Sequence, residues 1–217
     1  MQGPGPHAPR DERIDYMLDR TEIFDLIRYE RLCRDIRDWD GLVKSYVPGA
    51  PVRTSWFDGT IEEFAEASRQ KMEVGGSMGA HWIMPTKLKL NKPRATVESP
   101  AFIYDRLTFE GVEFDFFAFV RFFSKVLLTD DGWKLVNFEG IYNRDYLRAV
   151  NPSDKLPVNW DEIATYRKSY RHMGWTQAYR GYHVNPELIG DDRPDLVQAF
   201  YAEADHWLET GEEGGPK

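Results

Sequence analysis

Residues 112–128 read VEFDFFAFVRFFSKVLL, the strongest structural signal in the chain. Every second residue at its start is apolar, and a period of two predicts a long β-strand with one buried face. The residues assigned to that face are Val112, Phe114, Phe116, Ala118, Val120 and Phe122. The opposite face carries Phe117, Phe119 and Phe123 among charged side chains, which makes it too aromatic for open water. We therefore expect a second subunit or a C-terminal segment to cover it.

Three more strands are expected around this one, at residues 81–90, 96–108 and 133–142. Upstream, Asp19 and Glu22 form a capping box that predicts the start of an amphipathic helix. A short helix over residues 38–46, a strand over 52–57 and a helix over 60–72, closed by Gly75 and Gly76, should follow. Helices followed by an antiparallel meander form an α+β pattern. The expected fold is a cone-shaped, curved antiparallel sheet wrapped around the N-terminal helices.

Two short segments carry the residues best suited to chemistry. Asp35 lies in RDIRDWDGL (34–42), where a helix should end, and His81 lies in GAHWIMPTKLKL (79–90), where a strand should begin. If the fold brings them together, the carboxylate can orient and charge-stabilise the imidazole, which makes a general base. Alternatively, Asp35 bonds nearby backbone amides and His81 a backbone carbonyl. Asp38 and Asp40 are also close, but they are better placed to cap a helix.

Strict alternation raises a difficulty for His81. It places this side chain on the same face as Lys87 and Lys89, while Leu88 faces the other way. A bulge, or a break of the ladder at Pro85, would turn His81 and Leu88 towards the same side.

Three segments in order resemble the SnoaL-like branch of the nuclear-transport-factor-2-like superfamily: EIFDLIRYERLCRDIRDWDGL (22–42), PGAPVRTSWFDG (48–59) and AHWIMPTKLKL (80–90). The resemblance spans residues 15–147 and implies a cystatin-like α+β barrel. Members include scytalone dehydratase, hexachlorocyclohexane dehydrochlorinase and polyketide cyclases. In the dehydratase and the dehydrochlorinase, an Asp just before the DW-type link pairs with a His that opens a strand. Asp35 and His81 match those two positions.

The resemblance implies a cofactor-free lyase. The Asp35–His81 pair would eliminate water, or another small fragment such as formaldehyde, from a hydrophobic aromatic or polycyclic molecule. Lignin-derived diaryl compounds are one specific possibility. An isomerase or a cyclase would use the same pair, and a non-catalytic ligand-binding or assembly domain is the main alternative from another class. The resemblance also implies a homodimer, or a higher homo-oligomer, formed sheet to sheet.

Four further residues are candidates for substrate binding. Trp56 falls where scytalone dehydratase has a substrate-binding tyrosine, but it lacks the hydroxyl, so we do not expect a close copy of that reaction. Tyr104, Asn137 and Tyr142 lie on strands expected to face the pocket, where each could bond a substrate or serve the fold. Arg121 as an inward catalytic cation is disfavoured by the alternation of its strand.

Composition narrows the classes of function. The net charge of −8 argues against nucleic acid or an anionic membrane surface as a partner. The single cysteine, Cys33, excludes an intrachain disulfide framework, suits a reducing cytoplasmic compartment and is an unfavourable nucleophile among apolar neighbours. The five histidines are scattered, and neither a dinucleotide nor a P-loop motif occurs, so neither a metal nor an organic cofactor is expected. MQGPGPHAPRDER lacks the apolar run of a signal peptide.

The expected organisation has three parts: a disordered lead-in (1–14), the barrel domain (15–147) and a C-terminal extension (148–217). In the extension, Asn159 and Glu162 form a second capping box, and Pro194 suits the first turn of a last helix. Residues 166–184 are dense in Tyr, Arg and His. We favour a clasp that packs against the sheet or a partner, and the alternative is a lid that stacks on an aromatic substrate.

Overall fold

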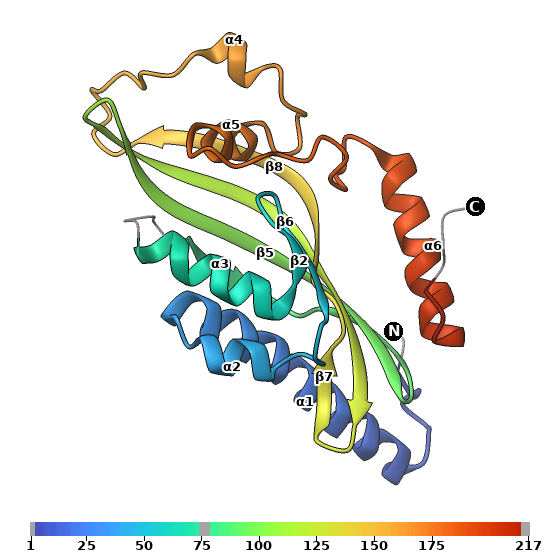
Figure 1. Ribbon diagram of the computed structural model, residues 1–217. Helices are drawn as coiled ribbons and strands as arrows, with labels where there is room; N and C mark the ends of the chain where they lie inside the picture. The colour runs from blue at the N-terminus through green and yellow to red at the C-terminus, as the bar shows by residue number, and fades with distance from the viewer. Residues whose placement is uncertain (1–2, 74–78, 214–217) are drawn as a thin grey trace.

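A computed structural model describes residues 3–73 and 79–213 of the chain. A curved antiparallel sheet crosses the molecule, with three N-terminal helices against one side and a helical extension at its far end and along its other side (Figure 1). The helices are α1 (Arg10–Ile36), α2 (Trp39–Lys44), α3 (Ile61–Glu73), α4 (Trp160–Ile163), α5 (Arg171–Tyr179) and α6 (Pro194–Thr210). The strands are β1 (Pro51–Arg53), β2 (Asp58–Thr60), β3 (Ala80–Ile83), β4 (Lys87–Asn91), β5 (Arg94–Phe109), β6 (Val112–Thr129), β7 (Gly132–Leu135) and β8 (Glu139–Ala149). The α+β class is as predicted.

The long hairpin of β5 and β6 forms the centre of the sheet. It pairs from Arg94–Leu127 to Phe109–Val112, and the two residues of its turn, Glu110 and Gly111, both have positive φ. That is the turn geometry that matches the twist of two antiparallel strands. β3 and β4 pair with β5, whereas β7 and β8 pair with β6.

The predicted alternation along β6 is confirmed. Its inward residues Phe116, Ala118, Val120 and Phe122 are each at most 4% exposed and belong to the main core, which they share with the apolar stripe of α1. Burial of this face against the helices supplies the hydrophobic driving force for the fold. Opposite Phe119 and Val120, β8 carries one extra residue, and a bulge of this kind bends a sheet.

The predicted start of the first helix is wrong. α1 begins at Arg10, and Asp11 and Glu12 in its first turn suit the positive end of the helix dipole. Asp19 therefore lies within the helix and accepts an ion pair from Lys92, with Nζ and Oδ2 2.7 Å apart. Residues 10–14 of the expected lead-in are helical. The closing signal at Gly75 and Gly76 lies outside the described residues.

The expected strand over residues 81–90 is two strands, with Pro85 between them. His81 pairs with Ile103 of β5, and Leu88 pairs with Val97 of the same strand. The chain advances seven residues from His81 to Leu88, whereas β5 advances only six between their partners. The break therefore shifts the alternation by one residue and turns both His81 and Leu88 inward. This resolves the difficulty that strict alternation posed.

Helix α6 covers part of the outer face of the sheet. The ring of Phe123 lies 4.9 Å from that of Phe200, and Phe123 is buried. Lys89 forms an ion pair with Asp205, which fixes the helix to β4. Phe119 stays exposed, so the predicted cover is present only over Phe123. Among the described residues, none of the helices combines the length and the apolar character needed to cross a membrane.

Candidate active site

The structure brings Asp35 and His81 into direct contact. Asp35 lies in the last turn of α1, and His81 is the second residue of β3. Asp35 Oδ2 accepts the backbone N–H of His81 at 2.7 Å, and Oδ1 lies 2.6 Å from His81 Nδ1. A carboxylate only accepts, so Nδ1 carries the hydrogen and Nε2 keeps its lone pair. The predicted contact is present, and it leaves Nε2 as the ring nitrogen that can accept a proton.

The surroundings of His81 keep its ring neutral. Burial lowers the pKa of His81 to about 4, helped by the positive charges of Arg31 and Arg34 and opposed by Asp35. Burial disfavours the charged imidazolium because water no longer solvates it. At neutral pH the ring is therefore in its basic form.

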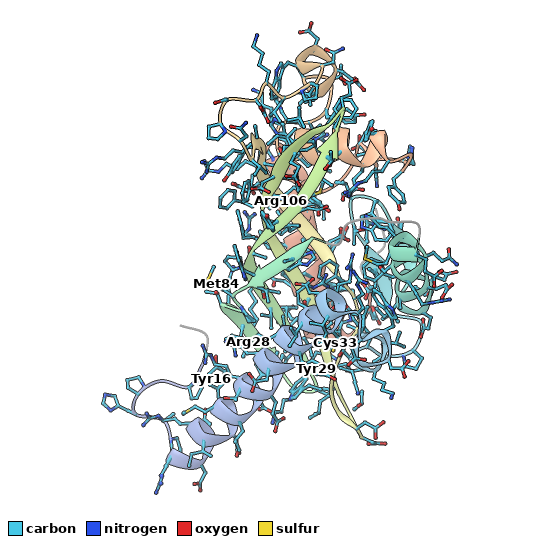
Figure 2. The ribbon with its side chains drawn as sticks, turned by 90° about the vertical axis from the view of Figure 1, so that its left-hand side faces the viewer. Tyr16, Arg28, Tyr29, Cys33, Met84 and Arg106 are labelled. Atoms are coloured by element: carbon cyan, nitrogen blue, oxygen red, sulfur yellow. The ribbon has the colours of Figure 1, made fainter. Side chains whose placement is uncertain are left out.

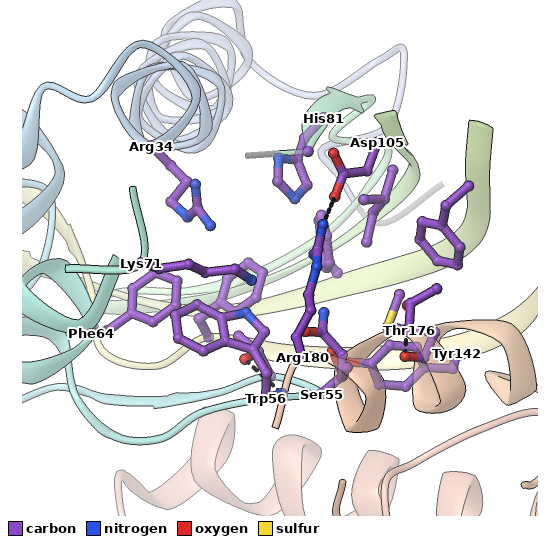
Figure 3. Close-up of a pocket in the computed structure, with 18 of the residues that line it drawn as sticks. Arg34, Ser55, Trp56, Phe64, Lys71, His81, Asp105, Tyr142, Thr176 and Arg180 are labelled. Atoms are coloured by element: carbon purple, nitrogen blue, oxygen red, sulfur yellow. Dashed lines mark hydrogen bonds and ion pairs between the residues drawn. The ribbon is translucent and has the colours of Figure 1, made fainter. Parts of the chain in front are cut away.

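His81 lines a pocket on the inner side of the sheet (Figure 3). The empty space between the lining residues amounts to about 710 Å³ when the open solvent at its mouth is included. Part of the wall is aromatic and consists of Trp56, Phe64, Phe116, Phe122, Phe138 and Tyr142.

Two of the four predicted substrate-binding residues line this pocket. The ring of Trp56 lies 5.6 Å from that of Phe64 and 5.4 Å from that of Tyr182. Tyr142 is buried, and burial raises the pKa of its phenol, so the hydroxyl keeps its proton and can donate a hydrogen bond.

The other two lie elsewhere, and their expected pocket-side placement is wrong. Tyr104 is on the outer face, because the inward position on β5 belongs to Asp105, and its hydroxyl donates to Asp115 at 3.0 Å. Asn137 lies under α6, where its Oδ1 accepts the backbone N–H of Lys125 at 2.7 Å. Both are structural hydrogen-bonding groups.

Arg121 and Cys33 have structural surroundings. Arg121 lies on the outer face, paired with Glu98 at 2.8 Å and Asp191 at 2.7 Å, as the alternation of β6 predicts. Cys33 is buried, and burial raises the pKa of its thiol, which disfavours the nucleophilic thiolate.

Four basic residues that we did not predict line the pocket wall: Arg31, Arg34, Lys71 and Arg180. Arg31 and Arg34 follow the buried Ile27 by four and seven residues, so helical spacing alone places them on the inner face of α1. That signal was available in the sequence. The position of Arg180 was not, since it depends on the path of the extension.

The extension closes one side of the pocket. Met173, Thr176 and Gln177 of α5 line it, and Arg180 just beyond the helix forms an ion pair with Asp105 at 3.2 Å. Residues 173–180 therefore form a wall of the site, while α6 fastens the end of the chain to the outer face. The clasp was favoured for residues 166–184. Trp175 of this segment does pack against Phe109 of β5, but other residues of the same segment line the pocket, where the lid alternative places them.

No cluster of three or more His, Cys, Asp or Glu side chains that could hold a metal ion occurs in residues 3–73 and 79–213.

Comparison with known proteins identifies a family that the sequence matches. The SnoaL-like domain family matches residues 15–139. A PEP2-like protein of Fusarium vanettenii is 28% identical over 207 residues, which cover 89% of this chain and 87% of that protein. Pea pathogenicity protein 2 of the same fungus is 27% identical over 220 residues, with 96% and 94% covered.

A solved structure shares the fold of the barrel. Hexachlorocyclohexane dehydrochlorinase LinA-type3 from Novosphingobium barchaimii superposes with a TM-score of 0.53 at 14% identity, over 67% of this chain and 99% of that chain. Almost all of that protein is matched, so this chain has about a third of its length beyond the shared barrel.

Proposed function

Because the chain belongs to the SnoaL-like domain family, we propose that it is a lyase that removes a proton from a small aromatic molecule and eliminates water or another small fragment. The observation that carries the proposal is the contact of Asp35 with His81 Nδ1 at 2.6 Å, at the wall of a pocket. Imidazole held by a carboxylate is a proton-transfer group of proven use in enzymes.

In the proposed step, His81 Nε2 takes a proton from the carbon next to the bond that will break. The hydrogen bond from Nδ1 to Asp35 then stabilises the imidazolium that forms. The electrons left on the carbon form the new double bond as the bond to the leaving group breaks. His81 can return its proton to a leaving hydroxide, which departs as water.

The wall of the pocket suits an aromatic substrate. Trp56, Phe64 and Phe122 offer ring faces and edges, and Tyr142 offers a hydroxyl donor. A lignin-derived diaryl compound that loses formaldehyde is one specific candidate. In that case His81 would take the proton from the hydroxyl of a hydroxymethyl group, and the C–C bond that holds this group would break. The electrons of that bond would form the new double bond as hydroxide leaves the neighbouring carbon and departs as water with the proton from His81. An isomerase would use the same pair, with the proton returned to a different carbon of the substrate.

The first test is a screen of aromatic alcohols and diols, with products identified by mass spectrometry. Wild type should convert at least one of them, and His81→Ala should not. His206→Ala is the matched control, because His206 is an exposed histidine on α6 outside the pocket. Equal turnover by wild type and His81→Ala would rule out His81 as the base.

A further inference from the structure

The geometry points to an acidic substrate: we propose that the pocket binds an aromatic carboxylate, with its charged end held by Lys71 between Arg34 and Arg180. This inference rests on the proposed function only in that it places the ligand in the same pocket as His81. It narrows the substrate from any aromatic molecule to one that carries a negative charge.

Lys71 is a buried cation in the pocket wall that a negatively charged ligand could pair with. It lies in the last turn of α3, only 7% of its surface is exposed, and it lines the pocket beside Trp56 (Figure 3). Its Nζ lies 4.4 Å from the ring centroid of Trp56 and 5.0 Å from that of Tyr182. Among the described residues, no carboxylate forms an ion pair with it. Aromatic rings stabilise an ammonium group less than a desolvated carboxylate would.

The charged residues around the pocket have a net charge of +1 when Lys71 is protonated. The basic residues in its described wall are Arg31, Arg34, Lys71 and Arg180, and the acidic residues in or directly behind that wall are Glu30, Asp35 and Asp105.

Two of these carboxylates bind arginines, and the third binds His81. The negative charges of all three also stabilise the guanidinium of Arg34. Glu30 accepts Arg31 Nη2 at 2.6 Å, Asp105 accepts Arg180 Nη2 at 3.2 Å, and Asp35 accepts the imidazole. A buried charge is costly unless it is paired. A bound carboxylate would bring the sum to zero.

The same surroundings make binding sensitive to pH. Burial, followed by the positive charges of Arg180 and Arg34, lowers the pKa of Lys71 to about 7, while Asp105 opposes the shift. A carboxylate bound beside Nζ favours the ammonium form and raises that pKa again. Tyr182 faces the same ammonium group through its ring. His81 is neutral in this range, because its pKa is about 4. A proton taken up on binding near neutral pH therefore belongs to Lys71.

Calorimetry on the full-length protein tests the charge preference. The probes are benzoate, 2-naphthoate and biphenyl-4-carboxylate, each against its neutral carboxamide of nearly the same shape. We expect at least one acid to bind roughly tenfold or more tightly than its amide, the scale of a charge-assisted contact. Lys71→Met should lose that preference, and Lys44→Met, which changes an exposed helical lysine, should keep it. If no acid binds more tightly than its amide, the proposal is overturned.

Proton uptake provides a second, independent readout. Titrations in buffers of different ionisation enthalpy should show uptake of about half a proton per ligand at pH 7, close to one at pH 8 and close to none at pH 6. Lys71→Arg should still prefer the acid but take up no proton, because arginine stays charged. Unchanged uptake in Lys71→Arg would overturn the assignment to Lys71.

The two proposals can fail separately. His81→Ala should bind the acids with the same preference, since His81 is neutral. If His81→Ala loses turnover but wild type binds the acids no more tightly than the amides, the anion site is refuted and the role of His81 as the base is retained. The reverse result, anion binding together with full turnover in His81→Ala, would refute the base alone.

Discussion

The carboxylate of Asp35 holds His81 at two points, through the backbone N–H at 2.7 Å and through ring Nδ1 at 2.6 Å. One side chain at the end of α1 thus fixes both the start of β3 and the orientation of the imidazole. The pair is structural and chemical at once, and a substitution must be designed to separate the two roles.

Asp35→Asn separates them. The amide oxygen can keep one of the two hydrogen bonds, so we expect a loss of about 1 kcal/mol in the free energy of unfolding. The negative charge that would stabilise the imidazolium is gone, so kcat should fall by about a hundredfold or more. Denaturant unfolding and steady-state kinetics on the same samples measure both. Asp40→Asn, at an exposed position nearby, should change neither. Near-normal kcat in Asp35→Asn would contradict the role of the carboxylate.

The pH profile of the reaction should reflect the low pKa of His81. Protonation removes the base, so kcat/KM should fall on the acid side near pH 4, and not near pH 6.5, where an exposed histidine titrates. Initial rates between pH 3.5 and 8, with stability checked at each point, measure this. An acid limb centred near pH 6.5 would mean that the ring is solvated or that another group titrates.

The stability of the protein should carry a signature of Lys71. Its pKa in the folded protein, about 7, lies below the ordinary 10.5, so the unfolded chain binds more protons between these values. The contribution of neutral Lys71 to the free energy of unfolding is therefore complete above pH 10.5 and is lost as the pH falls through 7. Relative to Lys71→Met, wild type should gain roughly 2 kcal/mol in the free energy of unfolding from pH 7 to pH 9. Urea unfolding of both proteins measures this difference, and a constant difference would contradict a buried, depressed lysine.

An aromatic patch on the outer face of the sheet should form the contact between subunits of a homodimer. The patch consists of Trp82, Phe102, Phe117, Phe119 and Tyr146, whose rings contact one another across four strands. Trp82 is 65% exposed and Tyr146 41%, and a contiguous exposed apolar patch can mark an interaction surface.

Light scattering should give twice the mass of the chain for wild type, and Phe119→Arg should shift it to the monomer. Trp160→Glu is the control, because Trp160 is an exposed aromatic residue on α4, away from the patch. A monomeric wild type would refute the prediction.

The sequence predicted the parts of the site that local patterns determine. Alternation along β6 placed its inward side chains. The contact of Asp35 with His81 over 46 residues was implied by the resemblance to the SnoaL-like family and not by a local pattern. The prediction for Tyr104 failed because the face of a strand depends on its register, and a shift of one residue reverses it.

The basic residues of the pocket were not predicted from the sequence. Lys71 and Arg180 come from α3 and from the extension, and only the folded chain brings them to the same cavity as His81. Arg34 could have been found from helical spacing, since it lies on the same stripe as Ile23 and Ile27. Long-range placement of this kind is not contained in any local pattern.

The most direct test of the central claim is rescue of His81→Ala by free imidazole. Once a substrate is identified, the turnover of this variant should be about a hundredfold or more below wild type. It should then rise with added imidazole, because the space left by the ring adjoins Asp35 and the pocket. The double variant Asp35→Asn, His81→Ala should recover much less. Turnover near the wild-type rate in His81→Ala without imidazole would contradict the account.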